Sequence, residues 1–245
     1  MLLSLDTSTL TLSLALTERD PRGTLQTIRA IDHHPPARQS ELLPGAIQAL
    51  LAEADVELGQ LEGIAVGLGP GSFTGLRIGM STAKALAYAC GLRVAGVSSL
   101  AAMALEGPAG RPLFVTSVAR RDDLYLGCYR HDGGRLEALE PETALSPEEL
   151  AERIRAVPES RVLGPSIEGY GDRLIALGVD RSQIVDTVRF APAARVAELV
   201  ELPAEQSLEA LFALEPHYVR ASEPERNPKF PPLPGPPPTA RLRDA

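Results

Sequence analysis

The sequence predicts an α/β protein made of two lobes, each of which opens with a β-hairpin. Three observations predict this class: alternating apolar and polar residues begin both halves of the 245-residue chain, continuous apolar runs follow them, and segments of helical period lie between the strands. The two halves meet near Gly107 to Gly110. The length is sufficient for one large domain or two small ones.

Three strands and a helix are predicted at the start of the chain. Residues 2–8 and 11–18 alternate around a short polar turn, which is the pattern of a hairpin, and residues 25–32 continue as a third strand. After the break at Pro35 and Pro36, residues 39–54 carry apolar side chains at helical period.

The middle of the first lobe combines a buried strand with a glycine-rich loop and a long helix. Residues 63–69 form a continuous apolar run, as expected of a strand that is covered on both faces. The stretch GLGPGSFTGLRIGMSTAKALAYACG follows, from Gly67 to Gly91. A strand at residues 93–97 and a helix from Ser98 complete this lobe, which we place at residues 1–108.

The pattern restarts at Arg111. Residues 112–119 and 123–130 form a second predicted hairpin, and residues 146–157 form a helix that opens with a capping box. A short strand, RVLGP, and two helical runs follow, at residues 161–165, 167–177 and 193–202. This second lobe contains fewer predicted strands than the first, and we place it at residues 109–221.

Composition excludes several classes of function. The net charge is −8, from 24 basic and 32 acidic residues, which disfavours strong direct binding to nucleic acid. The short basic cluster at Arg120 and Arg121 is interpreted as solvated surface. No run of 18 apolar residues suggests a membrane span, and two distant cysteines, Cys90 and Cys128, fit a reducing cytoplasm.

The last 24 residues, 222–245, contain eight prolines. Such a segment has little apolar surface to bury and cannot build the interior of a helix or sheet, so we expect a disordered or extended tail. A proline-rich ligand for a recognition domain is the alternative interpretation.

The glycine-rich loop does not match the known phosphate-binding motifs. A Walker loop requires lysine after its last glycine, but Leu76 and Arg77 follow Gly75. The spacing also differs from the dinucleotide fingerprint GxGxxG. A tight turn at Pro70 and Gly71 explains the loop without a ligand, although a helix beginning after a strand would suit an anion.

Small residues recur every four positions in the helix that follows: Gly75, Gly79, Ala83 and Ala87. A glycine inside a helix costs about 1 kcal/mol relative to alanine, so two of them require compensation. Close approach of another backbone would supply it. That backbone belongs either to the chain's own domain or to a partner, and the spacing alone leaves both open.

Several stretches resemble one known family. LSLDTST near the N-terminus, GLGPGSFTGLRIGMSTAKALA, VSSLAAMA and PHYVRASE (Pro216 to Glu223) are similar to motifs of the TsaB (YeaZ-type) proteins of tRNA threonylcarbamoyladenosine biosynthesis. The resemblance spans roughly residues 1–223. It implies the ASKHA fold of actin, sugar kinases and Hsp70, with two related lobes whose mixed β-sheets are flanked by helices.

The resemblance also implies a function. TsaB-like proteins are non-catalytic partners and scaffolds of the enzyme TsaD, and TsaE joins that assembly. The complex transfers a threonylcarbamoyl group to the adenosine beside the anticodon of tRNAs that read codons beginning with A. ATP or ADP and metal belong to the partner complex, so we expect no cofactor bound tightly by this chain and only indirect contact with tRNA.

The implied partner surface lies on the long helix, which also mediates homodimers in the family. It comprises Gly75, Leu76, Ile78, Gly79, Thr82, Ala83, Leu86 and Ala87. Two alternatives remain: a small-molecule kinase or ATPase on the ASKHA fold, and a self-contained homodimer with an unrelated function.

The resemblance further implies a degenerate nucleotide site. ASKHA enzymes hold phosphates with two D-x-G-[ST] hairpins, but the first hairpin here reads Asp6, Thr7, Ser8, with serine in place of the glycine. In the second hairpin the family pattern D-A-R is interrupted by Val118, which cannot coordinate Mg²⁺ or orient water. Arg120 and Arg121 remain there as possible anion contacts. Asp6 either caps the turn or retains a nucleotide role.

No metal site is expected. The catalytic paralogue holds metal through a histidine pair on the helix after the third strand, but the corresponding helix here contains none, and Gln39 occupies a position where relatives often have histidine. His33 and His34 are adjacent and point apart, so they cannot share one ion. No HExxH motif supports a peptidase.

Overall fold

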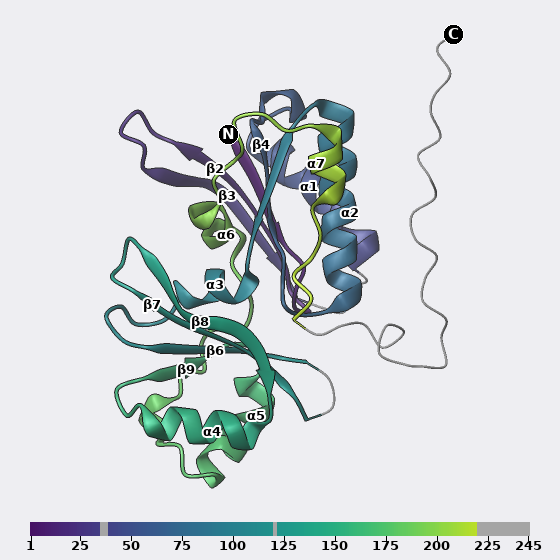
Figure 1. Ribbon diagram of the computed structural model, residues 1–245. Coiled ribbons are helices and arrows are strands. Elements are labelled where there is room, and N and C mark those ends of the chain that lie inside the picture. Colours follow the sequence, from purple (N-terminus) through teal and green to yellow (C-terminus); the bar gives the residue numbers. More distant parts are fainter. Residues whose placement is uncertain (35–38, 120–121, 220–245) are drawn as a thin grey trace, which may run out of the picture.

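The computed structural model describes residues 1–34, 39–119 and 122–219 and shows an α/β protein with two mixed sheets flanked by helices (Figure 1). The predicted fold class is therefore confirmed. Arg120 and Arg121 and the proline-rich segment from residue 222 lie outside the described residues, as does the Pro35–Pro36 break.

The first sheet has five strands in the order β3-β2-β1-β4-β5. Their bounds are β1 (Leu2–Asp6), β2 (Leu12–Arg19), β3 (Leu25–His33), β4 (Gly63–Gly67) and β5 (Arg93–Val97). Strands β1, β2 and β3 run antiparallel, whereas β4 pairs parallel to β1 and β5 parallel to β4. All five strands were predicted. The central ones are apolar because helices cover both of their faces.

The second sheet repeats this topology with one strand fewer. Its order is β8-β7-β6-β9, with β6 (Leu113–Val118), β7 (Leu124–His131), β8 (Leu136–Leu145) and β9 (Arg161–Leu163). Here too an antiparallel series of three strands is followed by a strand parallel to the first. The duplicated lobes are thus visible as the same connectivity, built twice.

Strand β8 was not predicted from the sequence. It is an edge strand that carries Glu137, Glu140, Pro141 and Glu142, residue types that are depleted in strands. Proline is tolerated there because an edge strand pairs on one side only. Tertiary pairing with β7 therefore overrides a weak local preference.

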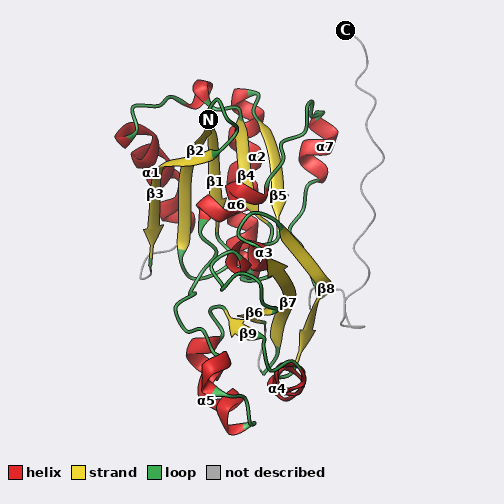
Figure 2. Ribbon diagram, turned by 90° about the vertical axis from the view of Figure 1, so that its left-hand side faces the viewer, coloured by secondary structure: helices red, strands yellow, loops and turns green. Residues whose placement is uncertain are grey.

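Two helices cover one face of the first sheet: α1 (Gln39–Glu53) and α2 (Phe73–Cys90). The opposite face is covered by α6 (Ala193–Leu199), and α3 (Ser99–Ala104) lies between the two sheets (Figures 1 and 2). Helix α2 begins at Ser72, whose hydroxyl accepts a hydrogen bond from the Gly75 amide. It ends at Gly91, whose φ of 67° is favourable for glycine.

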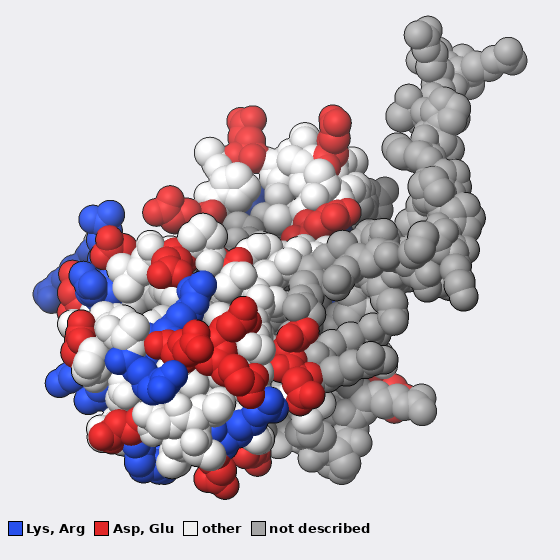
Figure 3. All heavy atoms as spheres, turned by 60° about the horizontal axis from the view of Figure 1, so that its bottom comes forward, with Lys and Arg blue, Asp and Glu red and all other residues white. Residues whose placement is uncertain are grey.

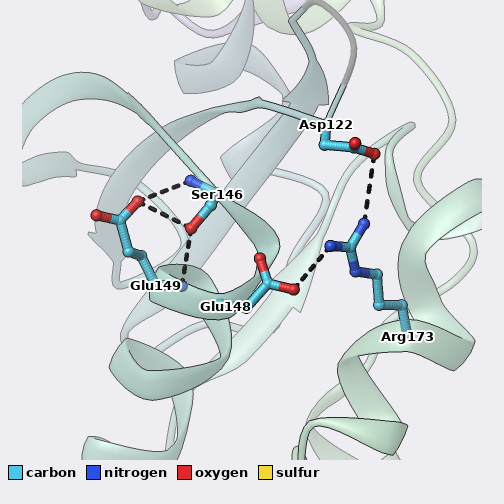
Figure 4. Close-up of polar contacts among 5 residues, drawn as sticks. All are labelled: Asp122, Ser146, Glu148, Glu149 and Arg173. Atoms are coloured by element: carbon cyan, nitrogen blue, oxygen red, sulfur yellow. Dashed lines mark hydrogen bonds and ion pairs between the residues drawn. The ribbon is translucent and has the colours of Figure 1, made fainter.

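The second lobe is closed by α4 (Pro147–Ala156) and α5 (Ile167–Ala176). The predicted capping box is present: the Glu149 amide donates to Ser146 Oγ at 3.3 Å and the Ser146 amide donates to Glu149 Oε2 at 2.8 Å. Arg173 of α5 joins Glu148 at 2.7 Å and Asp122 at 3.4 Å, which links α5 to α4 and to the β6–β7 turn (Figure 4). Short 3₁₀ turns lie at Leu58–Gln60 and Arg181–Gln183.

The chain returns to the first sheet after the second lobe. Helix α6 packs on β1, β2 and β4, and α7 (Leu208–Ala213) packs on α2. Between these helices the Gln206 side chain bonds both the amide and the carbonyl of Val94, at 2.7 and 2.9 Å, on the edge strand β5. Helices α6 and α7 therefore pack with the first lobe, although the predicted boundary at residue 221 assigns them to the second.

Three apolar clusters hold the structure together. One fills the space between the first sheet and α1 and α2, one lies at the junction of the lobes around α3 and α6, and one lies between the second sheet and α4 and α5. The apolar cluster around α3 and α6 contains Ala65 of β4 together with Leu113 and Val115 of β6, so the two lobes share a core. Among the described residues, no helix has the length and apolar character needed to cross a bilayer.

Candidate functional site

The predicted nucleotide hairpin is closed by its own side chains. Asp6 ends β1 and is completely buried. Its Oδ1 accepts hydrogen bonds from the Ser8 amide at 2.9 Å and from Ser8 Oγ at 2.7 Å. Its Oδ2 accepts from Ser99 Oγ at 2.5 Å, across the junction with α3. Both carboxylate oxygens are therefore used inside the chain.

The glycine-rich loop is tied to the same hairpin. The Ser72 amide donates to the Ser8 carbonyl at 2.7 Å, and the Gly69 amide donates to Ser99 Oγ at 3.0 Å. A Cβ at Gly67 would overlap Asp6 Oδ2, and one at Gly71 would overlap the Ser8 carbonyl. These two glycines therefore serve close packing of the loop on the hairpin.

Burial raises the pKa of the Asp6 carboxyl above its ordinary value of 3.8, against hydrogen bonds from Ser99 and Ser8 that favour the charged form. Each oxygen of this buried carboxyl group is bonded to a serine of the same chain. The geometry is that of a side chain that organises a turn through the Ser8 amide.

In the described part of the second hairpin, the side chains are exposed or bonded within the lobe. Val118 is 49% exposed at the end of β6, and Asp122 across the turn pairs with Arg173 (Figure 4). The buried hydroxyl of Thr116 donates to the Leu163 carbonyl at 3.2 Å, so it too is occupied within the lobe. Arg120 and Arg121 were predicted as anion contacts but are not among the described residues.

Two of the surface hollows of the described chain lie at the β2–β3 turn and beside the connection from β8 to α4. One is lined by residues 18–21 and 26, and the other by residues 143–145, 149, 152 and 153. The described residues also contain no group of three His, Cys, Asp or Glu side chains arranged to hold a metal. The predictions about bound cofactors and metals stay predictions.

Helix α2 presents its glycine–alanine face to its own sheet, contrary to the predicted partner surface. Gly75, Gly79, Ala83 and Ala87 are buried. A Cβ at Gly79 would overlap Thr7 Oγ1, and it would lie 3.1 Å from Leu5 Cδ1. The close approach that these small residues permit is therefore made with β1 of the same chain.

A hydrogen bond explains why the helix must lie so near. Thr7 Oγ1 donates to the Gly75 carbonyl at 2.8 Å, which joins the hairpin to the first turn of α2. Leu76 is also buried, so it and the four small residues are removed from the surface that we assign to a partner. The remaining predicted positions, Ile78, Thr82 and Leu86, are half-buried.

The solvent-facing side of α2 was missed by sequence reasoning. It carries Thr74, Ser81, Ala85 and Ala89, all exposed and mostly small. The residues at 81, 85 and 89 are small and share a helical face. This second four-residue spacing is the sequence pattern that could have indicated the solvent-facing side. Because the same spacing occurs on both sides of the helix, periodicity alone could not tell which side is buried.

Large apolar side chains border this face. Five of the ten exposed large apolar residues among the described ones lie on α2, α7 and the segment after α7. We call them the outer apolar surface: Phe73, Tyr88, Leu208, Phe212 and Tyr218. Exposed apolar groups gathered on one side of a protein indicate an interaction surface.

Ring contacts hold the outer apolar surface together. Tyr88 lies 6.0 Å from Phe212 and Phe73 lies 5.6 Å from Tyr218, between ring centroids. The Arg77 guanidinium sits 4.0 Å above the Phe73 ring. The helix α7 and the segment that follows it therefore extend the surface of α2.

The face of the molecule around the second lobe mixes charges of both signs. Acidic side chains are interspersed with basic ones there, without a continuous basic tract (Figure 3). This agrees with the net charge of −8. Such a face offers no extended attraction for a phosphate backbone.

Comparisons with known proteins agree on one family. A family model described as TsaD, tRNA N6-adenosine threonylcarbamoyltransferase, matches residues 34–165. The tRNA threonylcarbamoyladenosine biosynthesis protein TsaB of Bacillus subtilis is 30% identical over 243 residues, which cover 91% of this chain and 96% of that protein. An uncharacterized protein of Mycobacterium leprae is 35% identical over 163 residues. That match covers 62% of this chain but only 44% of the relative's length.

A solved structure shows the same architecture. YeaZ from Pseudomonas aeruginosa superposes with a TM-score of 0.67 at 29% sequence identity, covering 81% of this chain and 89% of that one. The similarity extends over both lobes because the shared coverage exceeds either lobe alone.

Proposed function

This chain belongs to the TsaB (YeaZ-type) family of tRNA threonylcarbamoyladenosine biosynthesis proteins, and on that premise we propose that it is a non-catalytic partner and scaffold of TsaD. In this role it supports transfer of a threonylcarbamoyl group to the adenosine beside the anticodon of tRNAs that read codons beginning with A. TsaE joins the assembly, which works in the cytoplasm.

The observation that carries the non-catalytic role is the buried Asp6. An ASKHA enzyme needs this carboxylate to face metal, water or phosphate, whereas here both oxygens are bonded to Ser8 and Ser99. Catalysis at this position would require breaking those bonds and exposing a fully buried group. ATP or ADP and any metal are therefore assigned to the partner complex.

The partner surface is proposed on the solvent-facing side of α2, not on its glycine–alanine face. Ser81, Ala85 and Ala89 let a helix of TsaD lie close, and the outer apolar surface borders them with side chains that gain from removal from water. In the absence of TsaD the same surface supports a homodimer. Contact with tRNA is made indirectly, because the chain is acidic.

The alternative of an ASKHA kinase or ATPase is not favoured. The curated TsaB relatives are named as tRNA threonylcarbamoyladenosine biosynthesis proteins, and the hairpin geometry supplies no free carboxylate. A self-contained homodimer of unrelated function has no observation in its favour.

The test is co-purification with TsaD from the same organism. Ala85→Arg places a long charged side chain in the middle of the proposed contact, at an exposed position where the fold tolerates it. We expect the dissociation constant for TsaD to rise about tenfold or more, which corresponds to about 1.4 kcal/mol of lost binding energy.

Ala156→Arg is the matched control, since Ala156 is also an exposed helical alanine but lies on α4 of the second lobe. It should leave the dissociation constant unchanged. If both variants bind TsaD as tightly as the wild type does, the proposed surface is wrong. Equal loss by both would show that the effect is not specific to α2.

A further inference from the structure

The last described residues form a connection between the two lobes. We call residues 214–219 the C-terminal strap. It follows α7, which packs on α2, and the His217 amide donates to the Leu68 carbonyl at 2.8 Å in the glycine-rich loop. The next residue, Tyr218, contacts Phe73 by its ring, and Arg77 Nε donates to its hydroxyl at 3.4 Å. One end of the strap is thus fixed to α2.

The other contact of the strap is with the second lobe. His217 Nδ1 lies 3.1 Å from Glu142 Oε2, and the Glu142 side chain, on strand β8, is only 7% exposed. Glu142 Oε1 accepts hydrogen bonds from Ser98 Oγ and from Tyr129 Oη. The four side chains, which we call the junction cluster, are Ser98, Tyr129, Glu142 and His217.

The junction cluster joins three separate parts of the chain. Ser98 caps α3, where its hydroxyl accepts from the Ala101 amide at 3.1 Å. Tyr129 belongs to β7 of the second sheet, and burial together with the Glu142 charge raises the pKa of its phenol, so it remains a donor. His217 comes from the strap. Glu142 is therefore the point at which both lobes and the strap meet.

One oxygen of Glu142 depends on the strap. Oε2 is buried without a hydrogen bond among the described residues, and its polar neighbour there is the His217 ring. A buried carboxylate oxygen left without any partner is costly. Lifting the strap would replace the His217 ring beside Oε2 by water and would remove this contact between the strap and the second lobe.

We propose that the C-terminal strap fixes the two lobes relative to each other and to the outer side of α2, with the contact between Glu142 and His217 as its fastening. Release of His217 frees Tyr218 from Phe73 and Arg77, and it removes the polar neighbour of Glu142 Oε2, whose other oxygen joins β8 to Ser98 at the start of α3. The inference concerns this chain alone and does not depend on the proposed partner.

The test is a double-mutant cycle on the full chain, with Glu142→Gln, His217→Ala and the combination. Each variant is followed by amide hydrogen exchange of α3, of β8 and of the first turns of α2. If the strap is fastened by this pair, each single variant speeds exchange in all three elements. The increase in exchange rate in the double variant then differs from the product of the increases in the two single variants by about threefold or more.

Glu137→Gln is the control, because Glu137 lies on the same strand but is exposed. It should leave exchange unchanged. Additive effects of the two substitutions, or faster exchange confined to residues 214–219, would overturn the proposal. His217 is itself half-exposed, so its truncation should leave the chain folded.

Discussion

At the scale of the residue, Asp6 shows how the chain's own serines hold a buried carboxyl group. A D-x-G-[ST] hairpin leaves its acidic oxygens open, but serine at position 8 supplies both an amide and a hydroxyl to Oδ1. Ser99 Oγ donates a hydrogen bond to Oδ2 and in turn accepts one from the Gly69 amide. The hydroxyl of Ser8 therefore adds to Asp6 Oδ1 a hydrogen bond that glycine could not supply.

The titration of Asp6 gives a testable consequence. Because burial raises its pKa in the folded state above 3.8, the folded chain holds this proton more tightly than the unfolded chain does. The stability that the protonated form contributes is complete at low pH and is lost as pH rises through the folded pKa. We expect the free energy of unfolding of the wild type, relative to Asp6→Asn, to fall as pH is raised from about 4.

Urea unfolding of both proteins over a series of pH values measures this difference. Asp172→Asn is the control, since Asp172 is exposed on α5, and its difference from the wild type should not follow the same trend. A wild type that gains stability relative to Asp6→Asn as pH rises would contradict the assigned direction.

At the scale of the element, α2 carries small residues on two sides for two reasons. Towards the sheet, Gly79 makes room for Thr7 and Leu5, and the helix comes near enough for Thr7 to bond the Gly75 carbonyl. Towards solvent, Ala85 and its neighbours have small, exposed side chains. The cost of glycine in the helix is thus offset inside the chain, which removes the argument that it must be offset by a partner.

Gly79→Ala tests the inward side. Alanine is favoured over glycine in a helix by about 1 kcal/mol, yet its Cβ would overlap Thr7 Oγ1, so we expect a net loss of about 1–3 kcal/mol in the free energy of unfolding. Chemical denaturation measures it.

Gly45→Ala in α1 is the matched control, because a Cβ there meets nothing within 4 Å. It should stabilise the protein by up to about 1 kcal/mol. If both substitutions stabilise the chain equally, the inward side of α2 is not closely packed. A larger side chain, as in Gly79→Leu, would disturb the fold as well. A loss of partner binding in that variant would therefore not show that Gly79 contacts the partner.

At the scale of the whole molecule, the two lobes share a topology but do not divide the chain cleanly. The first sheet is completed by α6, which arrives from beyond the second lobe and covers β1, β2 and β4. Its first residue, Ala193, donates from its amide to Ser13 Oγ at 2.8 Å. The lobe predicted at residues 1–108 therefore depends on residues that lie far along the sequence.

A fragment of residues 1–108 is expected to remain largely unfolded or to aggregate, because one face of its sheet would be exposed without α6. Joining residues 193–219 to this fragment through a flexible glycine–serine linker should restore a folded lobe. Circular dichroism and thermal unfolding distinguish a folded fusion, which unfolds cooperatively, from an unfolded fragment.

A control fusion with residues 193–199 replaced by a polar linker of equal length should not fold. Cooperative unfolding of residues 1–108 alone would show that α6 is not needed and would restore the predicted boundary.

The sequence by itself determined the strands other than β8, the long helix and the duplicated order of elements. These features arise from local patterns: alternation for the hairpins, continuous apolar runs for β4, and the Ser146 capping box for α4. The degenerate character of the hairpin at Asp6, which the family resemblance implies, stays a prediction.

Only the tertiary structure decided which side of α2 is buried, that β8 is a strand, and that α6 and α7 return to the first lobe. The physical reason is the same in each case. Period four is compatible with either side of a helix, an edge strand is held by its neighbour's backbone instead of its own side chains, and a helix of seven residues finds its place through distant contacts that no local pattern records.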